Sequence, residues 1–471
     1  MRSSSPAVQG NAFQVQVTFT VLGLFALAGV CYLWALASYS QVAVLALTIG
    51  VGFFLISFFS IKIGLIVMAI AMLFSPEITV GAVGFQTVGT IGSRPITIRI
   101  EDVLIPVLCL AWLARLGSRQ ESRLFVSSPV NTPIVLLLAL TAISTAAGIN
   151  SGRILLMPAV FYILKTVEFL TIFFLVVNYV RTEEEVREFM GYVLFVLALV
   201  GIYTLFQVPT VQIFSERRIT APFEGTPEPG TVGGYMAFLL LIVICIVFYE
   251  EKPLMKLLYG LLGALVLIPF IYTLNRTSYI ALLGGLFFIA VMGKRKWFLF
   301  LLIALLFSSP LWLPPAVKER IAFTWEDAAN PGRFMGVDHS LQERVVVYQK
   351  MWWSLQQRPL IGWGASSFNH PDSQYANTLH ETGLIGICLW AWIFLRIFRM
   401  SKWLFDSLEG GMAKGMVLGY RAGVVAILLH CFGSATFYIV RIMEPFWFVT
   451  GLIVALYLIR SSKVASAVET R

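Results

Sequence analysis

The stretch from residue 344 to residue 386 gathers most of the side chains that could do chemistry. It starts as a polar helix, continues as PLIGWGASSF (359–368), and then as DSQYANTLHETGLIG (372–386), which runs into an apolar segment. Asp372 is the first candidate for a general base that takes a proton from a substrate hydroxyl, and His370 is the second. The alternatives are a turn residue and a solvent-exposed loop histidine.

Arginines supply the second kind of chemistry. Arg276 lies in TLNRTSYIALLGG, at a turn between two apolar runs, and Arg217 and Arg218 open the loop RRITAPFEGTPEPGTVGGYMAF. Arginine stays protonated at any relevant pH and can grip phosphate oxygens through a bidentate fork. The pattern favours a site for a lipid pyrophosphate, and anchoring at lipid headgroups is the alternative for each arginine.

Five more side chains complete the predicted site. Arg344, Trp352 and Trp353 lie on the polar helix, and we expect them to contact the substrate, the arginine through its charge and the tryptophans by stacking. Glu381 is expected to organise the start of the next helix, because an acid in the first turn is stabilised by the helix dipole, or else to bind glycan. Arg441 could extend the anion site or anchor at headgroups.

The rest of the chain has the composition of a membrane protein. Of its 471 residues, 58% are hydrophobic and 13% are charged, against roughly 25% charged in soluble domains. Its net charge of +9 comes from basic residues between apolar runs, without a patch or arm, so no nucleic-acid partner is expected. An all-α polytopic membrane protein is therefore predicted.

The apolar runs predict twelve to fourteen transmembrane helices. They lie near 17–38, 41–59, 62–74, 102–116, 132–149, 157–179, 189–208, 232–249, 254–273, 277–292, 297–313, 378–396, 415–437 and 443–459. With fourteen spans and a cytoplasmic N-terminus, every short basic loop falls on the same side, as the positive-inside rule requires. This predicts a multi-pass membrane protein with both termini in the cytoplasm.

Because successive loops lie on alternate sides of the membrane, the chain divides into residues 1–313 with about eleven helices, an external loop 314–377, and residues 378–471 with about three helices. Two smaller external segments are 75–101, which alternates apolar and polar residues as a β-hairpin does, and 209–231. The loop 314–377 should contain an amphipathic helix. Its expected start is the capping box Ser340–Glu343, its apolar stripe Leu341, Val345, Tyr348, Trp352 and Leu355, and its end Pro359.

The order of these motifs resembles the O-antigen ligase and O-antigen polymerase (Wzy-type) family of bacterial membrane glycosyltransferases. The resemblance rests on Arg218 before GTPEPGTVGGYMAF, Arg276 in NRTSYIAL, the P-L-x-G-x-G element at 359–364, and the following L-x-E-x-G-L-x-G. Ligase-type members carry a His-Asn pair before the E-x-G, where this chain has Asp372-Ser373. That departure is closer to polymerase-like relatives.

The resemblance implies transfer of a glycan from an undecaprenyl-pyrophosphate-linked oligosaccharide at the outer face of the bacterial inner membrane. The prediction is a polymerase of O-antigen or exopolysaccharide repeats, with Arg276 and Arg218 on the pyrophosphate and Asp372 on the acceptor. A chain-length regulator and a flippase are possible partners. No cofactor or metal is expected, because the chain has no D-x-D, Walker A or GxGxxG motif and no metal-ligand spacing.

Two alternatives stay open. A ligase would attach finished glycan to lipid A core or to a protein with the same fold. A lipid-glycan flippase or secondary transporter would build on the pair Lys165 and Glu168, which lies inside a predicted span.

Overall fold

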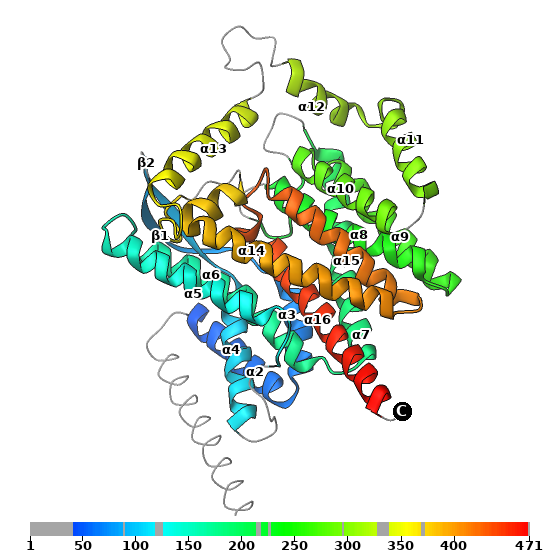
Figure 1. Cartoon of the computed structure of the whole chain (residues 1–471), viewed down its shortest axis with the longest axis horizontal. Helices are drawn as coiled ribbons and strands as arrows, with labels where there is room; N and C mark the ends of the chain where they lie inside the picture. Colours follow the sequence, from blue (N-terminus) through cyan, green and yellow to red (C-terminus); the bar gives the residue numbers. More distant parts are fainter. Residues whose placement is uncertain are drawn as a thin grey trace, which may run out of the picture. The chain divides into compact units, whose positions relative to one another are not determined.

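The computed structural model describes residues 41–87, 90–117, 126–212, 218–224, 228–293, 296–326, 339–368 and 373–469. Within them the chain is helical apart from one hairpin (Figure 1). The helices are α2 (Gln41–Phe59), α3 (Ile61–Phe74), α4 (Ile100–Gly117), α5 (Asn131–Asn150), α6 (Leu156–Tyr179), α7 (Glu183–Leu205), α8 (Pro229–Tyr249), α9 (Pro253–Ile271), α10 (Arg276–Met292), α11 (Lys296–Trp312), α12 (Pro315–Glu326), α13 (His339–Gln357), α14 (Gln374–Ser407), α15 (Gly411–His430) and α16 (Val440–Glu469), with short 3-10 turns η1 (Val208–Thr210) and η4 (Thr436–Tyr438).

Thirteen of the fourteen predicted apolar runs coincide with helices, and the first, 17–38, lies outside the described residues. In the described part, eight helices are long and apolar enough to cross a membrane, or nine if α11 and α12, bent by 100°, form one broken span. Shorter apolar helices are Thr48–Phe59, Ile61–Phe74 and Arg276–Met292. The chain is therefore a polytopic, helical membrane protein.

The predicted hairpin is confirmed. Strands β1 (Ile78–Thr87) and β2 (Thr90–Ile98) pair antiparallel, from Ile78 opposite Ile98 to Thr87 opposite Thr90, with a register shift between Thr79 and Gly81. The extra residue of such a shift strengthens the local twist of the pair.

By contacts the chain forms two compact units. The first comprises residues 1–68 and 100–126 and contains α2 and α4, which pack together. The second comprises residues 69–99 and 127–471 and contains the hairpin and α5 to α16. The predicted division at 313 and 377 remains a prediction.

The core of the second unit lies around α8, α15 and α16, whose side chains are mostly buried. Three glycines spaced by four residues, Gly415, Gly419 and Gly423, let α15 approach α8 closely. A Cβ atom on Gly419 would lie 2.4 Å from the Ile242 Cα. Small residues at this spacing are how helices pack tightly where lipid removes the hydrophobic drive.

Helix α13 ends at Gln357, shortly before Pro359 as expected, but its buried face differs in part from the predicted stripe. Val347, Tyr348, Met351 and Leu355 pack with Phe368 and Ala376, whereas Trp352 is 61% exposed. Trp352 follows Met351 by 100° around the helix, and this turns its side chain away from the core. The side chains of the capping box lie outside the described residues.

Candidate functional site

Helix α14 is broken at Gly383, which has φ 64° and ψ −161°. The break separates a short half-helix, 374–382, from a long one, 384–407. In an unbroken helix the amides of Leu384 and Ile385 would donate to the carbonyls of His380 and Glu381. The break leaves all four backbone groups to find other partners, which is costly away from water.

The loop 359–364 supplies all four partners. Two of its amides donate to the freed carbonyls, and two of its carbonyls accept from the freed amides. The pairs are Trp363 N to His380 O (2.9 Å), Gly364 N to Glu381 O (2.8 Å), Leu384 N to Pro359 O (2.8 Å) and Ile385 N to Leu360 O (3.1 Å). The P-L-x-G-x-G and E-x-G motifs therefore form one interlocked backbone structure, the loop–helix junction (359–364 with 380–385).

The glycines of both motifs are required by this close approach. A Cβ atom on Gly362 (φ 66°) would lie 2.5 Å from the His380 carbonyl oxygen, and one on Gly383 would lie 2.4 Å from the Leu360 carbonyl oxygen. The left-handed conformation adds strain for any other residue type.

Two hydroxyl groups of α5 hold the junction from the other side. The Ser144 Oγ lies 2.6 Å from the Ile361 carbonyl oxygen and 2.8 Å from that of Glu381, and the Thr145 Oγ1 accepts from the Ala365 amide at 3.0 Å. Both side chains are buried. A sequence search for charged residues misses them, because serine and threonine in an apolar run usually bond to their own helix.

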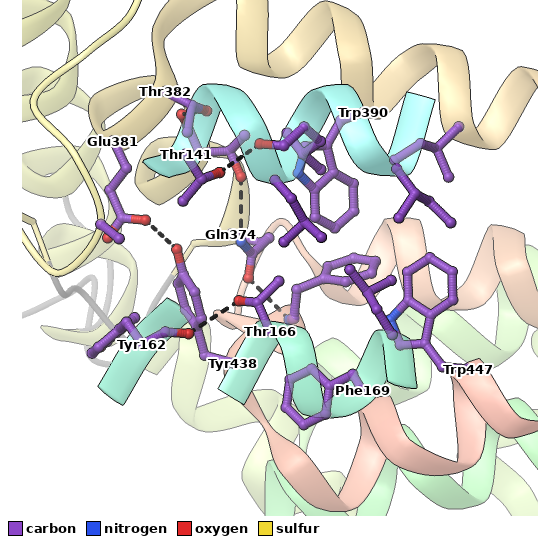
Figure 2. Close-up of a pocket in the computed structure, with 18 of the residues that line it drawn as sticks. Thr141, Tyr162, Thr166, Phe169, Gln374, Glu381, Thr382, Trp390, Tyr438 and Trp447 are labelled. Carbon is purple, nitrogen blue, oxygen red and sulfur yellow. Dashed lines mark hydrogen bonds between the residues drawn. The ribbon is translucent and has the colours of Figure 1, made fainter. Parts of the chain in front are cut away.

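Glu381 closes one end of a cavity of about 90 Å³ between α5, α6, α14 and α16 (Figure 2). One carboxylate oxygen, Oε1, accepts from the Ser366 amide at 3.0 Å, and the other accepts from the Tyr438 hydroxyl. Burial and the neighbouring carboxylate raise the pKa of Tyr438 well above its usual range, so it stays a proton donor to Glu381. The expectation that Glu381 lies in the first turn of a helix is wrong, because α14 begins at Gln374 and has no acidic residue in its first turn; Glu381 lies beside the break at Gly383 instead.

The lining of this cavity changes from polar to apolar. Gln374 lies beside Glu381 and Tyr438, where its side-chain oxygen accepts from the Phe437 amide at 2.9 Å. Trp390 and Trp447 lie on the opposite side in Figure 2. An acid at one end and aromatic rings at the other suit a ligand that is part hydroxylated and part apolar.

A second cluster surrounds the start of α10. Arg276 is the first residue of α10, and Asn275 caps the helix by accepting from the Ser278 amide at 2.9 Å. Arg344 of α13 lies 3.4 Å from both the Thr277 Oγ1 and the Gly433 carbonyl oxygen. Two of the predicted arginines thus lie at the same helix terminus, whose positive dipole end also favours anions.

His430 belongs to this cluster and was not predicted. It is fully buried at the end of α15, with Nε2 3.3 Å from the Ser278 Oγ and Nδ1 2.8 Å from the Thr436 Oγ1. Because the Ser278 hydroxyl also lies 3.1 Å from the Asn275 Oδ1, the imidazole links the cap of α10 to the turn after α15. A histidine ending a long apolar run was the only sequence signal.

Arg441 is buried elsewhere. Its guanidinium, 2% exposed, donates to four backbone carbonyls and lies 3.6 Å from the Glu77 carboxylate. The carbonyls belong to Leu73 (2.9 Å), Pro222 (2.7 Å), Ser75 (3.3 Å) and Phe223 (3.4 Å). These contacts join α16 to the end of α3 and to the loop before α8, and a role for Arg441 in anion binding remains a prediction.

The other predicted residues divide into two groups. Trp352 and Trp353 are largely exposed on α13, and Arg218 is half-buried before α8. Arg217, His370 and Asp372 lie outside the described residues. Their roles remain predictions.

Comparison with known families identifies the region that contains the loop–helix junction and the start of α10. Residues 261–391 match the family model Wzy_C, described as O-antigen ligase. No curated protein matches the chain. The matched segment runs from α9 to the middle of α14 and includes Arg276, Arg344 and the loop–helix junction. The match supports glycan transfer of the ligase or polymerase type, on lipid-linked glycans. The chain is therefore a multi-pass membrane protein that carries the domain of the O-antigen ligase and polymerase family.

Proposed function

We propose that this protein is a polymerase that joins undecaprenyl-pyrophosphate-linked oligosaccharide repeats at the outer face of the bacterial inner membrane. The observation that supports it best is the position of Arg276 and Arg344 at one helix start, inside the segment that matches the family model. The predicted orientation puts this helix start on the outside, with both termini in the cytoplasm.

In the proposed reaction an acceptor sugar hydroxyl attacks the anomeric carbon of the donor glycan. The bond from that carbon to the pyrophosphate oxygen breaks, and the lipid pyrophosphate leaves with the electron pair. Arg276, Arg344 and Arg218 stabilise the negative charge that grows on this leaving group. Asp372, or His370 in its place, takes the proton from the hydroxyl. No step needs a metal ion.

A ligase is the second candidate, because the family model bears its name. It would use the same donor and the same charge stabilisation, and it would differ only in the acceptor, which would be lipid A core or a protein. Asp372 in place of the His-Asn pair favours the polymerase.

The experiment is glycan analysis in a strain that lacks this protein, complemented with wild type, Arg276→Ala or the control Arg181→Ala. Arg181 is exposed before α7, at the end predicted to be cytoplasmic. Gels that resolve repeat number should show single repeats without a ladder for the empty strain and for Arg276→Ala, and a full ladder for Arg181→Ala. Long polymer retained on carrier lipid would identify a ligase. Unchanged glycan in the empty strain would overturn both.

A further inference from the structure

Two arginines that play no part in the proposed reaction lie over one buried tryptophan. The guanidinium carbon of Arg153 is 4.0 Å from the centre of the Trp363 ring, and that of Arg358 is 4.2 Å from it. The two positive charges are therefore within about 8 Å of each other, close enough to repel. Stacking on the same aromatic ring partly compensates that repulsion.

The backbone holds all three side chains in place. Trp363 belongs to the loop–helix junction, and its indole Nε1 lies 3.4 Å from the Ser354 carbonyl oxygen. Arg153 follows Gly152, whose left-handed conformation (φ 68°) turns the chain after α5, and the Arg153 amide donates to the Gly148 carbonyl at 3.2 Å. Arg358 directly follows α13. The pair is thus held beside the loop–helix junction, to which Trp363 belongs.

Neither guanidinium has an anionic partner in the described residues. The side chains of Arg153 and Arg358 form no ion pair or hydrogen bond there, and their ring contact with Trp363 is the interaction they make. By contrast, the ammonium group of Lys165 pairs with the Glu168 carboxylate at 2.9 Å. Two adjacent cations with ten N–H donors in total can accept an external anion.

The surroundings of the pair indicate the depth of lipid headgroups. Beside Arg153, the first residues of α6 expose apolar side chains, with Leu156 58% and Met157 64% exposed. Beside Arg358, Leu360 is 59% exposed and Trp353 57%. Apolar residues at the end of a spanning helix, together with an exposed tryptophan and arginines, are typical of the boundary between hydrocarbon and headgroups.

We propose that Arg153 and Arg358, stacked on Trp363, bind the phosphate of an anionic phospholipid headgroup. The lipid would occupy the rim between the α5–α6 turn and the end of α13, and it would tie α13 to the membrane surface. A phosphate could also come from a soluble diphosphate, but the exposed apolar side chains on both sides favour a lipid. This site is separate from the proposed reaction and does not depend on it.

The test uses the purified, delipidated full-length chain. Phosphatidylglycerol, phosphatidylcholine or inorganic diphosphate is added, and bound lipid is counted by native mass spectrometry while the unfolding temperature is measured. Wild type should retain phosphatidylglycerol and gain thermal stability. Arg153→Gln with Arg358→Gln should bind it about tenfold more weakly, because the charge-assisted hydrogen bonds are lost. Arg181→Gln, which removes an exposed arginine away from any such ring, should behave as wild type.

Two results would overturn the proposal. Equal phosphatidylglycerol binding by the double variant and wild type would show that the arginines do not hold the lipid. Arginine-dependent stabilisation by inorganic diphosphate, without any by phosphatidylglycerol, would assign the site to a soluble anion. If the glutamine pair does not fold, Arg153→Lys with Arg358→Lys keeps both charges without the planar fork, and weaker lipid binding than wild type is again expected.

Discussion

The loop–helix junction and the arginines of the cluster at the start of α10 lie in one matched segment, but the junction and the cluster are built in different ways. In the junction, backbone groups pair with backbone groups at 2.8–3.1 Å, and glycines allow the contact. In the cluster, side chains carry the structure, and the described hydrogen bonds of Arg344 are long, at 3.4 Å. The comparison indicates that the motif glycines of this chain build a backbone scaffold, whereas the arginines are the side chains that we propose for substrate binding.

The largest effect is expected where the scaffold is broken. Gly383→Ala places a methyl group against the Leu360 carbonyl in a left-handed conformation, and this should cost about 3 kcal/mol or more of unfolding free energy. Gly260→Ala on α9 is the control, because nothing lies within 4 Å of a Cβ atom there. Its stability should change by less than about 1 kcal/mol. Thermal unfolding in detergent measures both, and equal stabilities would contradict the scaffold role.

Variants in the cluster at the start of α10 should lose activity rather than stability. Arg344→Gln should lower glycan transfer about 100-fold, because a charge that faces the leaving group is lost, while the unfolding temperature stays near that of wild type. Lys350→Gln on the same helix, at an exposed position, should leave both unchanged. A loss of stability equal to that of Gly383→Ala would show that the cluster is also structural, and the contrast would disappear.

Glu381 belongs to the junction, but these variants change only its side chain and leave the backbone pairing in place, so a smaller effect than that of Gly383→Ala is expected. Glu381→Ala leaves the Ser366 amide without its acceptor and should destabilise by about 1–3 kcal/mol. Glu381→Gln keeps one oxygen for that amide and should cost less than about 1 kcal/mol. Equal unfolding free energies of the two variants would show that the carboxylate oxygen does not hold the loop in place.

The last prediction concerns pH and involves neither region. Burial raises the pKa of Glu224, in the loop before α8, from 4.5 to about 7. The folded state then holds the proton more tightly than the unfolded state, so this stabilisation is complete below pH 4.5 and is lost as the pH rises through 7. Wild type should lose stability relative to Glu224→Gln over that range in unfolding experiments. A constant difference would contradict the raised pKa.

Hydropathy located the helices well, because lipid imposes a length and an apolar composition on any span. The alternation around the glycines of 75–101 likewise predicted the hairpin. The motif glycines were visible, but their function was not, because the pairing of residues 359–364 with a break in α14 depends on contacts between separate segments. His430 was missed for the same reason, since its partners Ser278 and Thr436 come from other elements.

Arg441 has a consequence for the order in which the protein is made. Its guanidinium holds carbonyls at the end of α3 and in the loop at 222–223, which leave the ribosome long before α16 does. Until the last span is synthesised, those carbonyls lack this donor, and so these contacts between early and late segments form only at the end of synthesis. Chains truncated before residue 441 should therefore be recognised as incomplete by membrane quality control, even though they contain the whole segment that matches the family model.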